Sequence, residues 1–149
     1  MNKAIVILRG SSSGKTQLNK IAKDNGTWVW NCSPYDAMVV IAENLGQLAE
    51  HIELAIPNFR KLYIYQTIRR FSKDKNAELL LVHGCDVELS KLIAEDFRGF
   101  TVRSLFIEND EDAKTPVLWF DKTILFDENF DRNVVEFLAS LNIGMKRSD

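Results

Sequence analysis

Residues 4–16 read AIVILRGSSSGKT, and this stretch decides the fold. The five apolar residues from Ala4 to Leu8 form a short run bounded by turn residues, which predicts a strand. Small residues follow from Gly10 to Gly14, and apolar residues with helical spacing begin at Leu18. A strand, a loop of small residues and a helix in that order are typical of a sheet whose strands alternate with helices.

The same alternation continues along the rest of the chain. Further short apolar runs predict strands at residues 27–30, 78–83, 101–107 and 123–126. Stretches with helical spacing lie between and after these runs, at residues 35–45, 59–68, 89–97 and 130–141. Because parallel strands bury both faces and crossovers are right-handed, we predict an α/β fold of three layers. Its sheet is mainly parallel and five-stranded, with helices on both faces.

Two capping signals support these boundaries, one at residues 33–36 and one at Asp86, which could similarly cap the helix at residues 89–97. Ser33, Pro34 and Asp36 supply a capping hydroxyl, a proline at the first helical position and a carboxylate three residues after the cap. Residues 117–120 form one more apolar run, which either pairs with residues 123–126 as a hairpin or is an edge segment. No repeat, low-complexity tract or linker divides the sequence, so we expect a single domain over residues 1–149.

The composition excludes several classes of protein. The chain has 149 residues, of which 46% are hydrophobic and 27% charged, which is enough apolar mass for a core. A net charge of -2 gives no overall basic field, so nucleic acid is disfavoured as a partner and an anion site must be local. The two cysteines suit a reducing cytosol, and the N-terminal apolar run is too short for a membrane span or signal peptide. We therefore expect a cytoplasmic protein without a membrane partner.

Residues 9–16 carry the one strong chemical signal. Small side chains allow successive backbone N–H groups to surround a phosphate, and the dipole of the following helix adds to the attraction. In such a loop Lys15 would reach the β- and γ-phosphates, and the Thr16 hydroxyl would ligate Mg²⁺. The alternative is a serine-rich turn with a capping Thr16 and a solvated lysine. The predicted site for ATP and Mg²⁺ consists of Arg9, Gly10, Ser11, Ser12, Ser13, Gly14, Lys15 and Thr16.

With its strand, loop and helix, this segment resembles the Walker A loop of the P-loop NTPases, and the chain resembles their small nucleoside and nucleotide kinases. It departs from the usual pattern, because Arg9 stands five residues before Gly14 and Gly10 comes one residue late. A weaker likeness to phage-type deoxynucleoside monophosphate kinases rests on residues 32–36 and 78–107. The resemblance implies the strand order 2-3-1-4-5. It also implies a phosphotransferase that moves the γ-phosphoryl group of ATP to a nucleotide or other small acceptor.

Such a transfer needs an acid or base and further cations near the loop. Asp36 after the second strand and Asp86 after the third are candidate acids, and His83 is a candidate base. Asn31, Ser33 and Tyr35 share the edge of Asp36. The structural alternatives are helix caps for the two acids and a hydrogen-bonded histidine. Arg69 and Arg70 either clamp the acceptor or belong to a solvated helix face.

Two other hypotheses remain open. The chain lacks the early loop glycine, an acid directly after Val82 and an arginine-bearing lid, features that support a nucleotide-binding or switch module without kinase activity. A third hypothesis is single-strand nucleic-acid binding through the cationic residues 60–75, which would depend strongly on salt. The sequence leaves the acceptor, the choice between ATP and GTP, and the oligomeric state open.

Overall fold

The computed structural model describes residues 2–55, 58–109 and 119–143. Its centre is a sheet in the order β2-β3-β1-β4-β5, in which every neighbouring pair is parallel. The strands are β1 (Ala4–Gly10), β2 (Val29–Cys32), β3 (Leu79–His83), β4 (Thr101–Glu108) and β5 (Lys122–Leu125). This architecture confirms the predicted α/β class and the strand order that the resemblance implied.

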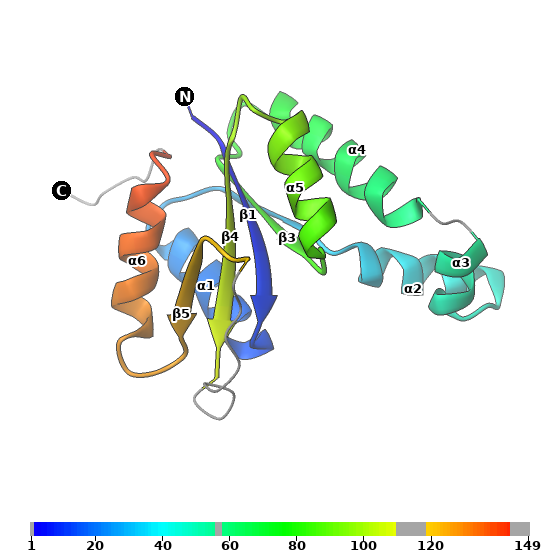
Figure 1. The fold of residues 1–149 in the computed structure, drawn as a ribbon, viewed down its shortest axis with the longest axis horizontal. Coiled ribbons are helices and arrows are strands. Elements are labelled where there is room, and N and C mark those ends of the chain that lie inside the picture. Colours follow the sequence, from blue (N-terminus) through cyan, green and yellow to red (C-terminus); the bar gives the residue numbers. More distant parts are fainter. Residues whose placement is uncertain (1, 56–57, 110–118, 144–149) are drawn as a thin grey trace.

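Helices cover both faces of the sheet (Figure 1). Helices α1 (Ser12–Asp24) and α6 (Phe130–Ser140) pack on one face, with the Ala4, Val6 and Leu8 side of β1. Helices α4 (Phe59–Lys73) and α5 (Val87–Asp96) pack on the other, with Ile5 and Ile7. Both faces of β1 are buried, and its first five residues, Ala4 to Leu8, are accordingly all apolar.

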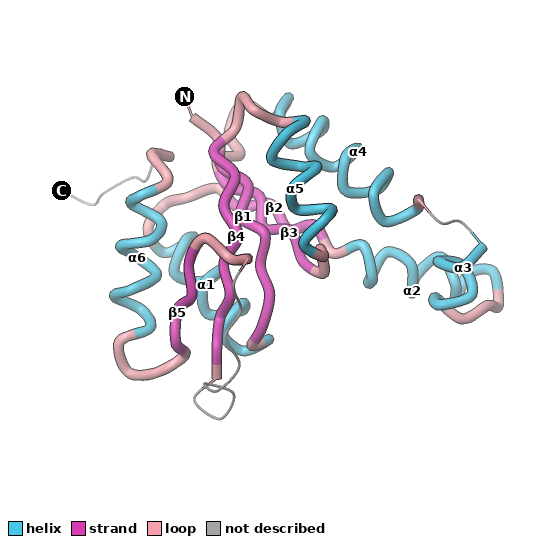
Figure 2. Tube along the Cα trace, in the orientation of Figure 1, coloured by secondary structure: helices cyan, strands magenta, loops and turns pink. Residues whose placement is uncertain are grey.

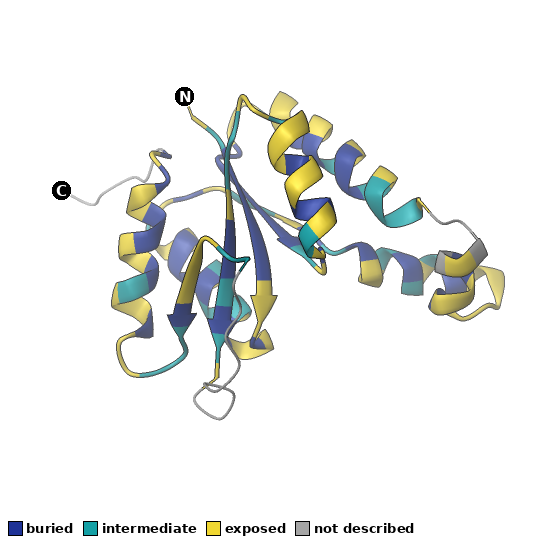
Figure 3. Cartoon of the chain, viewed as in Figure 1, coloured by how far each residue is buried: buried dark blue, intermediate teal, exposed yellow. Residues whose placement is uncertain are grey.

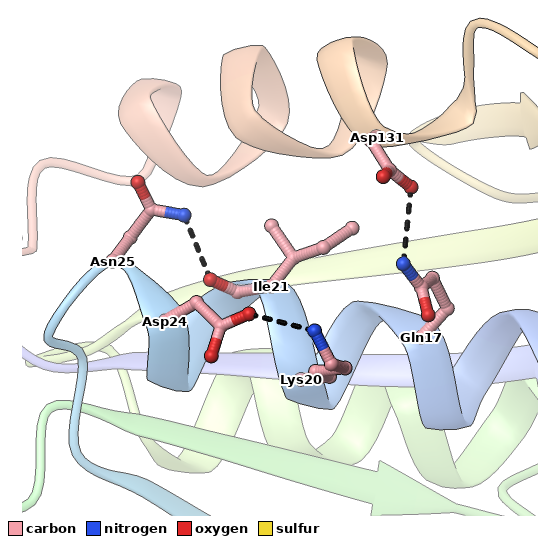
Figure 4. Close-up of polar contacts among 6 residues, drawn as sticks. All are labelled: Gln17, Lys20, Ile21, Asp24, Asn25 and Asp131. Carbon is pink, nitrogen blue, oxygen red and sulfur yellow. Dashed lines mark hydrogen bonds and ion pairs between the residues drawn. The ribbon is translucent and has the colours of Figure 1, made fainter.

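A polar contact joins α1 to α6, and two more stabilise α1 itself. The side-chain amide of Gln17 on α1 donates to a carboxylate oxygen of Asp131 on α6 at 3.3 Å (Figure 4). One turn further along α1, Lys20 pairs with Asp24 at 3.0 Å within the same helix. The side chain of Asn25 donates to the carbonyl of Ile21 and closes the end of α1.

An arm of two helices lies between β2 and α4. It consists of α2 (Pro34–Leu45) and α3 (Ala49–Ala55), and it extends beyond the sheet (Figures 1 and 2). Its own small core is formed by Met38, Ala42, Ala49 and Ile52. The sequence predicted α2, but α3 was not anticipated.

The strand boundaries differ slightly from the predicted ones. The second strand begins at Val29 rather than at residue 27. Strand β5, which covers most of the predicted run at residues 123–126, pairs in parallel with β4. Phe120 and Trp119 precede β5 outside any strand, and residues 117 and 118 of the hypothetical hairpin lie outside the described residues. None of the helices within the described ranges has the length and apolar character that a membrane span requires.

Candidate functional site

A pocket of about 610 Å³ opens where the carboxyl ends of β2 and β3 meet the start of α1. Ligands of open parallel sheets bind at this edge. One wall consists of residues from the start of α1, and the opposite wall of residues from the ends of β2 and β3 and the start of α2. The lining residues are Ser12, Lys15, Thr16, Asn31, Ser33, Tyr35, Asp36, His83 and Gly84.

Most of the segment predicted to surround a phosphate is helical. Helix α1 begins at Ser12, so only Ser11 lies between β1 and α1. The Ser11 N–H donates to the carbonyl of Ile107 at 2.9 Å, and the Lys15 N–H donates to the Ser11 carbonyl at 2.9 Å. The Gly14 N–H donates to the Ser11 hydroxyl oxygen at 3.0 Å. Three amides of the predicted phosphate loop are therefore already engaged by protein atoms.

The spacing of the two glycines explains this early helix start. Three residues separate Gly10 from Gly14, whereas the usual phosphate loop has four between its glycines. Both glycines pack closely on β4: a Cβ on Gly14 would lie 2.4 Å from the Ile107 Cγ2 atom. Their lack of a side chain therefore serves packing in this structure.

Two main-chain donors still face outward at the start of α1. The N–H groups of Ser12 and Ser13 have no hydrogen-bond acceptor among the residues that the structure describes. They belong to the first turn of the helix, which carries the positive end of the helix dipole and contains no acidic residue. This arrangement can hold one phosphate group rather than wrap a whole triphosphate.

Lys15 adds a charge to the same wall. Its side chain is half-buried, lines the pocket, and has no hydrogen-bond or ion-pair partner among the described residues. Burial and, to a smaller extent, the neighbouring Arg9 cation lower the pKa of Lys15. An anion in the pocket would offset both effects on the pKa, because its negative charge would stabilise the protonated form of Lys15.

The opposite wall carries a carboxylate. The Ser33 hydroxyl donates to the Asp36 carboxylate at 2.7 Å, in the first turn of α2. Ser33 is the N-cap of α2 but makes no side-chain capping bond to the backbone, so the predicted capping box is not formed. Asp36 is exposed and lines the pocket, where it faces the Lys15 wall.

His83 lies between the two walls at the end of β3. Its Nε2 atom is 3.2 Å from the Asn31 Oδ1 atom, and Asn31 donates in turn to Asn19 at 3.1 Å. With Asn31 in this orientation, Nε2 carries the proton and Nδ1 keeps a free lone pair. Burial and, secondarily, the Lys15 cation lower the pKa of His83 below its ordinary 6.5, although Asp36 opposes them. The ring is therefore neutral at pH 7.

The structure places the remaining predicted residues outside this pocket. Asp86 is the N-cap of α5, where its carboxylate accepts the Leu89 N–H at 2.8 Å. Arg69 and Arg70 are exposed on α4 and do not line the pocket. The guanidinium of Arg9 donates to the Cys85 carbonyl at 3.2 Å. Of the predicted catalytic residues, the pocket brings together Lys15, Asp36 and His83.

The pocket offers oxygen ligands to Mg²⁺. The Thr16 hydroxyl donates to the Ser12 carbonyl at 3.1 Å, which leaves the lone pairs of its oxygen available. No group of three or more His, Cys, Asp and Glu side chains that could hold a metal occurs among the described residues. Mg²⁺ usually keeps several waters and takes one or two carboxylates together with substrate phosphates, so the Thr16 hydroxyl and the Asp36 carboxylate are of the ligand types that suit it.

Comparisons with known proteins bear on the fold. No protein-family model matches the chain, and no curated protein matches its sequence. One de novo designed protein with the P-loop NTPase fold is 17% identical, with a TM-score of 0.53 over 95% of this chain and 93% of that one. A second such design is 16% identical, with a TM-score of 0.51 over 93% and 91% of the two chains.

A natural enzyme also occurs among the similar structures. Shikimate kinase from Bacteroides thetaiotaomicron is 13% identical, with a TM-score of 0.49 over 93% of this chain and 97% of the enzyme. The likeness to the two designed proteins shows that this chain has the P-loop NTPase fold.

Proposed function

We propose that the pocket binds ATP through its phosphate groups and that the protein transfers the γ-phosphoryl group to a small acceptor, such as a nucleotide. The observation that supports this proposal is the joining of two chemically different walls in one pocket. Lys15, Thr16 and the free amides of Ser12 and Ser13 suit an anion, and the opposite wall offers a carboxylate and a neutral imidazole.

Each wall has a role in this reaction. Lys15 and the first turn of α1 would hold one phosphate group of ATP, and bound Mg²⁺, held by Thr16 and Asp36, would neutralise charge on the triphosphate. The acceptor oxygen forms a bond to the γ-phosphorus as the bond to the β-phosphate bridge breaks, and ADP leaves. A hydroxyl acceptor would give its proton to Nδ1 of His83, which the Asn31 contact leaves unprotonated.

A second candidate function is nucleotide binding without transfer. Three engaged amides at Ser11, Gly14 and Lys15 favour it, because they reduce the donors available to a triphosphate. The commitment of Asp86 to a helix cap favours it as well, since no carboxylate follows β3 directly. The two candidates share the ATP site and differ in the fate of the γ-phosphate.

Titration calorimetry with ATP and Mg²⁺ tests the shared site. Lys15→Met removes the pocket cation, and we expect ATP affinity to fall at least ~10-fold, as for loss of a charge-assisted contact. Lys20→Met is the matched control on the same helix, because Lys20 pairs with Asp24 on the exposed side of α1 (Figure 4). Absence of ATP binding by the unaltered protein, or equal losses in both variants, would overturn both candidates.

Product formation across a panel of nucleoside and nucleotide acceptors separates the candidates. We expect transfer by the unaltered protein, and Asp36→Asn should lower the transfer rate while ATP binding persists. ATP binding without transfer to any acceptor would favour the second candidate.

A further inference from the structure

The arm formed by residues 34–55 carries an exposed apolar surface with only acidic formal charges. Its most exposed apolar side chains are Leu45, Leu48 and Leu54, which are 63%, 62% and 78% exposed. The arm contains one aspartate and three glutamates but no lysine or arginine. An exposed apolar patch rimmed by polar residues marks an interaction site when its members are contiguous. In Figure 3, the exposed residues of α3 are drawn in yellow.

The adjoining helix α4 has the opposite charge. Arg69, Arg70 and Lys73 are exposed on it, and we call these three residues the basic stripe. Arg69 and Lys73 share a helix face with the exposed Leu62, because residues 62, 66, 69 and 73 recur at helical spacing, and Arg70 lies beside this face. Within the described part of the chain, the three cations form no salt bridge. They also lie outside the candidate active site, so the proposed function does not account for them.

The arm adjoins α4, the helix that carries the basic stripe. Phe59, in the first turn of α4, packs against the core of the arm, and Leu62 follows it three residues later. Along α2, α3 and α4, which adjoin one another in Figure 1, the chain thus carries an acidic, leucine-rich arm, then the exposed Leu62, then the basic stripe. A two-fold rotation places the unlike ends of two such regions against each other, which is the self-complementarity that a symmetric dimer needs.

We propose that a second copy of this chain docks on this region, with the arm of each copy on the basic stripe of the other. Charge complementarity favours this occupant, because a second copy offers an acidic arm to the basic stripe of the first and a basic stripe to its acidic arm. The leucines would form the apolar centre of the interface, and the charges would form its rim and set its orientation. This proposal depends on neither ATP binding nor phosphoryl transfer.

Sedimentation or light scattering of the full chain over a concentration series tests the proposal. We expect a dimer, and its dissociation constant should rise at least ~10-fold between about 0.05 M and 0.5 M salt, because screening weakens the rim. Leu45→Ser with Leu54→Ser should also weaken the dimer. A protein that stays monomeric at low salt and high concentration would overturn the proposal.

Charge reversal with a mixing step identifies the partner surface. Arg69→Glu with Arg70→Glu, and separately Glu43→Lys with Glu50→Lys, should each weaken the dimer at least ~10-fold. An equimolar mixture of the two double variants should recover association, because one arm and one stripe then match. Lys91→Glu with Arg98→Glu, exposed on and after α5, is the matched control and should leave the dimer unchanged.

Two outcomes would contradict this surface. If the mixture of reversed variants does not associate more strongly than either alone, the arm and the stripe are not partners. If the unaltered protein stays monomeric but binds a single-stranded oligonucleotide through the stripe, nucleic acid is the occupant instead. Circular dichroism of each variant shows whether it is folded, and the mixing step compares folded variants only.

Discussion

Gly10 packs against the backbone of Ile107 so closely that a Cβ on Gly10 would lie 2.0 Å from the Ile107 carbonyl oxygen. The same oxygen accepts the N–H of Ser11 at 2.9 Å. Strand β4 therefore fixes the point at which β1 turns into α1. The contact also explains why the segment before Lys15 is short and helical rather than an open loop.

We expect Gly10→Ala to lower the free energy of unfolding by at least ~3 kcal/mol, because a Cβ would clash with backbone atoms that cannot rotate away. Gly10 also has a φ of +108°, which disfavours any side chain. Gly46→Ala is the matched control: its φ is +67° but no atom lies within 4 Å of an added Cβ, so we expect a loss of about 1 kcal/mol. Urea denaturation measures both, and equal losses would argue against the β4 contact.

The main elements of the fold could be predicted because burial leaves a clear pattern. Strand β1 packs on both faces and reads as an apolar run, and the same holds for β3. The start of α1 could not be predicted, because serine and glycine are typical of both a phosphate loop and a helix cap. The short spacing between Gly10 and Gly14 favours the cap, but the contact with Ile107, far away in sequence, is visible only in the fold.

Part of the candidate site could also be predicted from the sequence, because the order of strands and helices implies a parallel sheet. Lys15 and Asp36 lie in the first turns of the helices that follow β1 and β2, and His83 is the last residue of β3. The parallel topology brings these strand ends to one edge. The pair of His83 and Asn31 depends on the register between β2 and β3, which no local pattern specifies. Asp86 was ambiguous, because the same carboxylate suits a cap and a catalytic acid, and its geometry is that of a cap.

The cap at Asp86 leads to a second prediction. Asp86→Ala should lower the free energy of unfolding by about 1 kcal/mol, because the Leu89 N–H loses its acceptor at the start of α5. Asp86→Ser should restore most of that stability, since serine also caps helices. Calorimetric ATP affinity should stay unchanged in both variants, as Asp86 does not line the pocket. A loss of ATP binding in the stable Asp86→Ser variant would instead place this carboxylate in the site.

The two cysteines are expected to be unreactive in the folded protein. Both side chains are buried, and burial raises the pKa of Cys32 to about 11 and that of Cys85 to about 12. Because only the thiolate attacks, iodoacetamide at neutral pH should label both slowly in the native state and rapidly in urea. Mass spectrometry of the labelled protein measures the rates. Rapid native labelling of either thiol would show that its site opens without unfolding.

The last prediction concerns stability against pH. Burial lowers the pKa of His83 in the folded protein, whereas in the unfolded chain the imidazole titrates near its ordinary 6.5. As the pH falls below that value the unfolded chain binds a proton first, so the free energy of unfolding should decrease between about pH 7 and pH 5. His83→Gln keeps a donor for Asn31 and should flatten this slope. His51→Gln, at an exposed position on α3, should leave the slope as it is. Urea denaturation over this pH range measures the slope, and identical slopes in the His83→Gln variant and the unaltered protein would mean that the folded state tolerates a charged imidazole at this position.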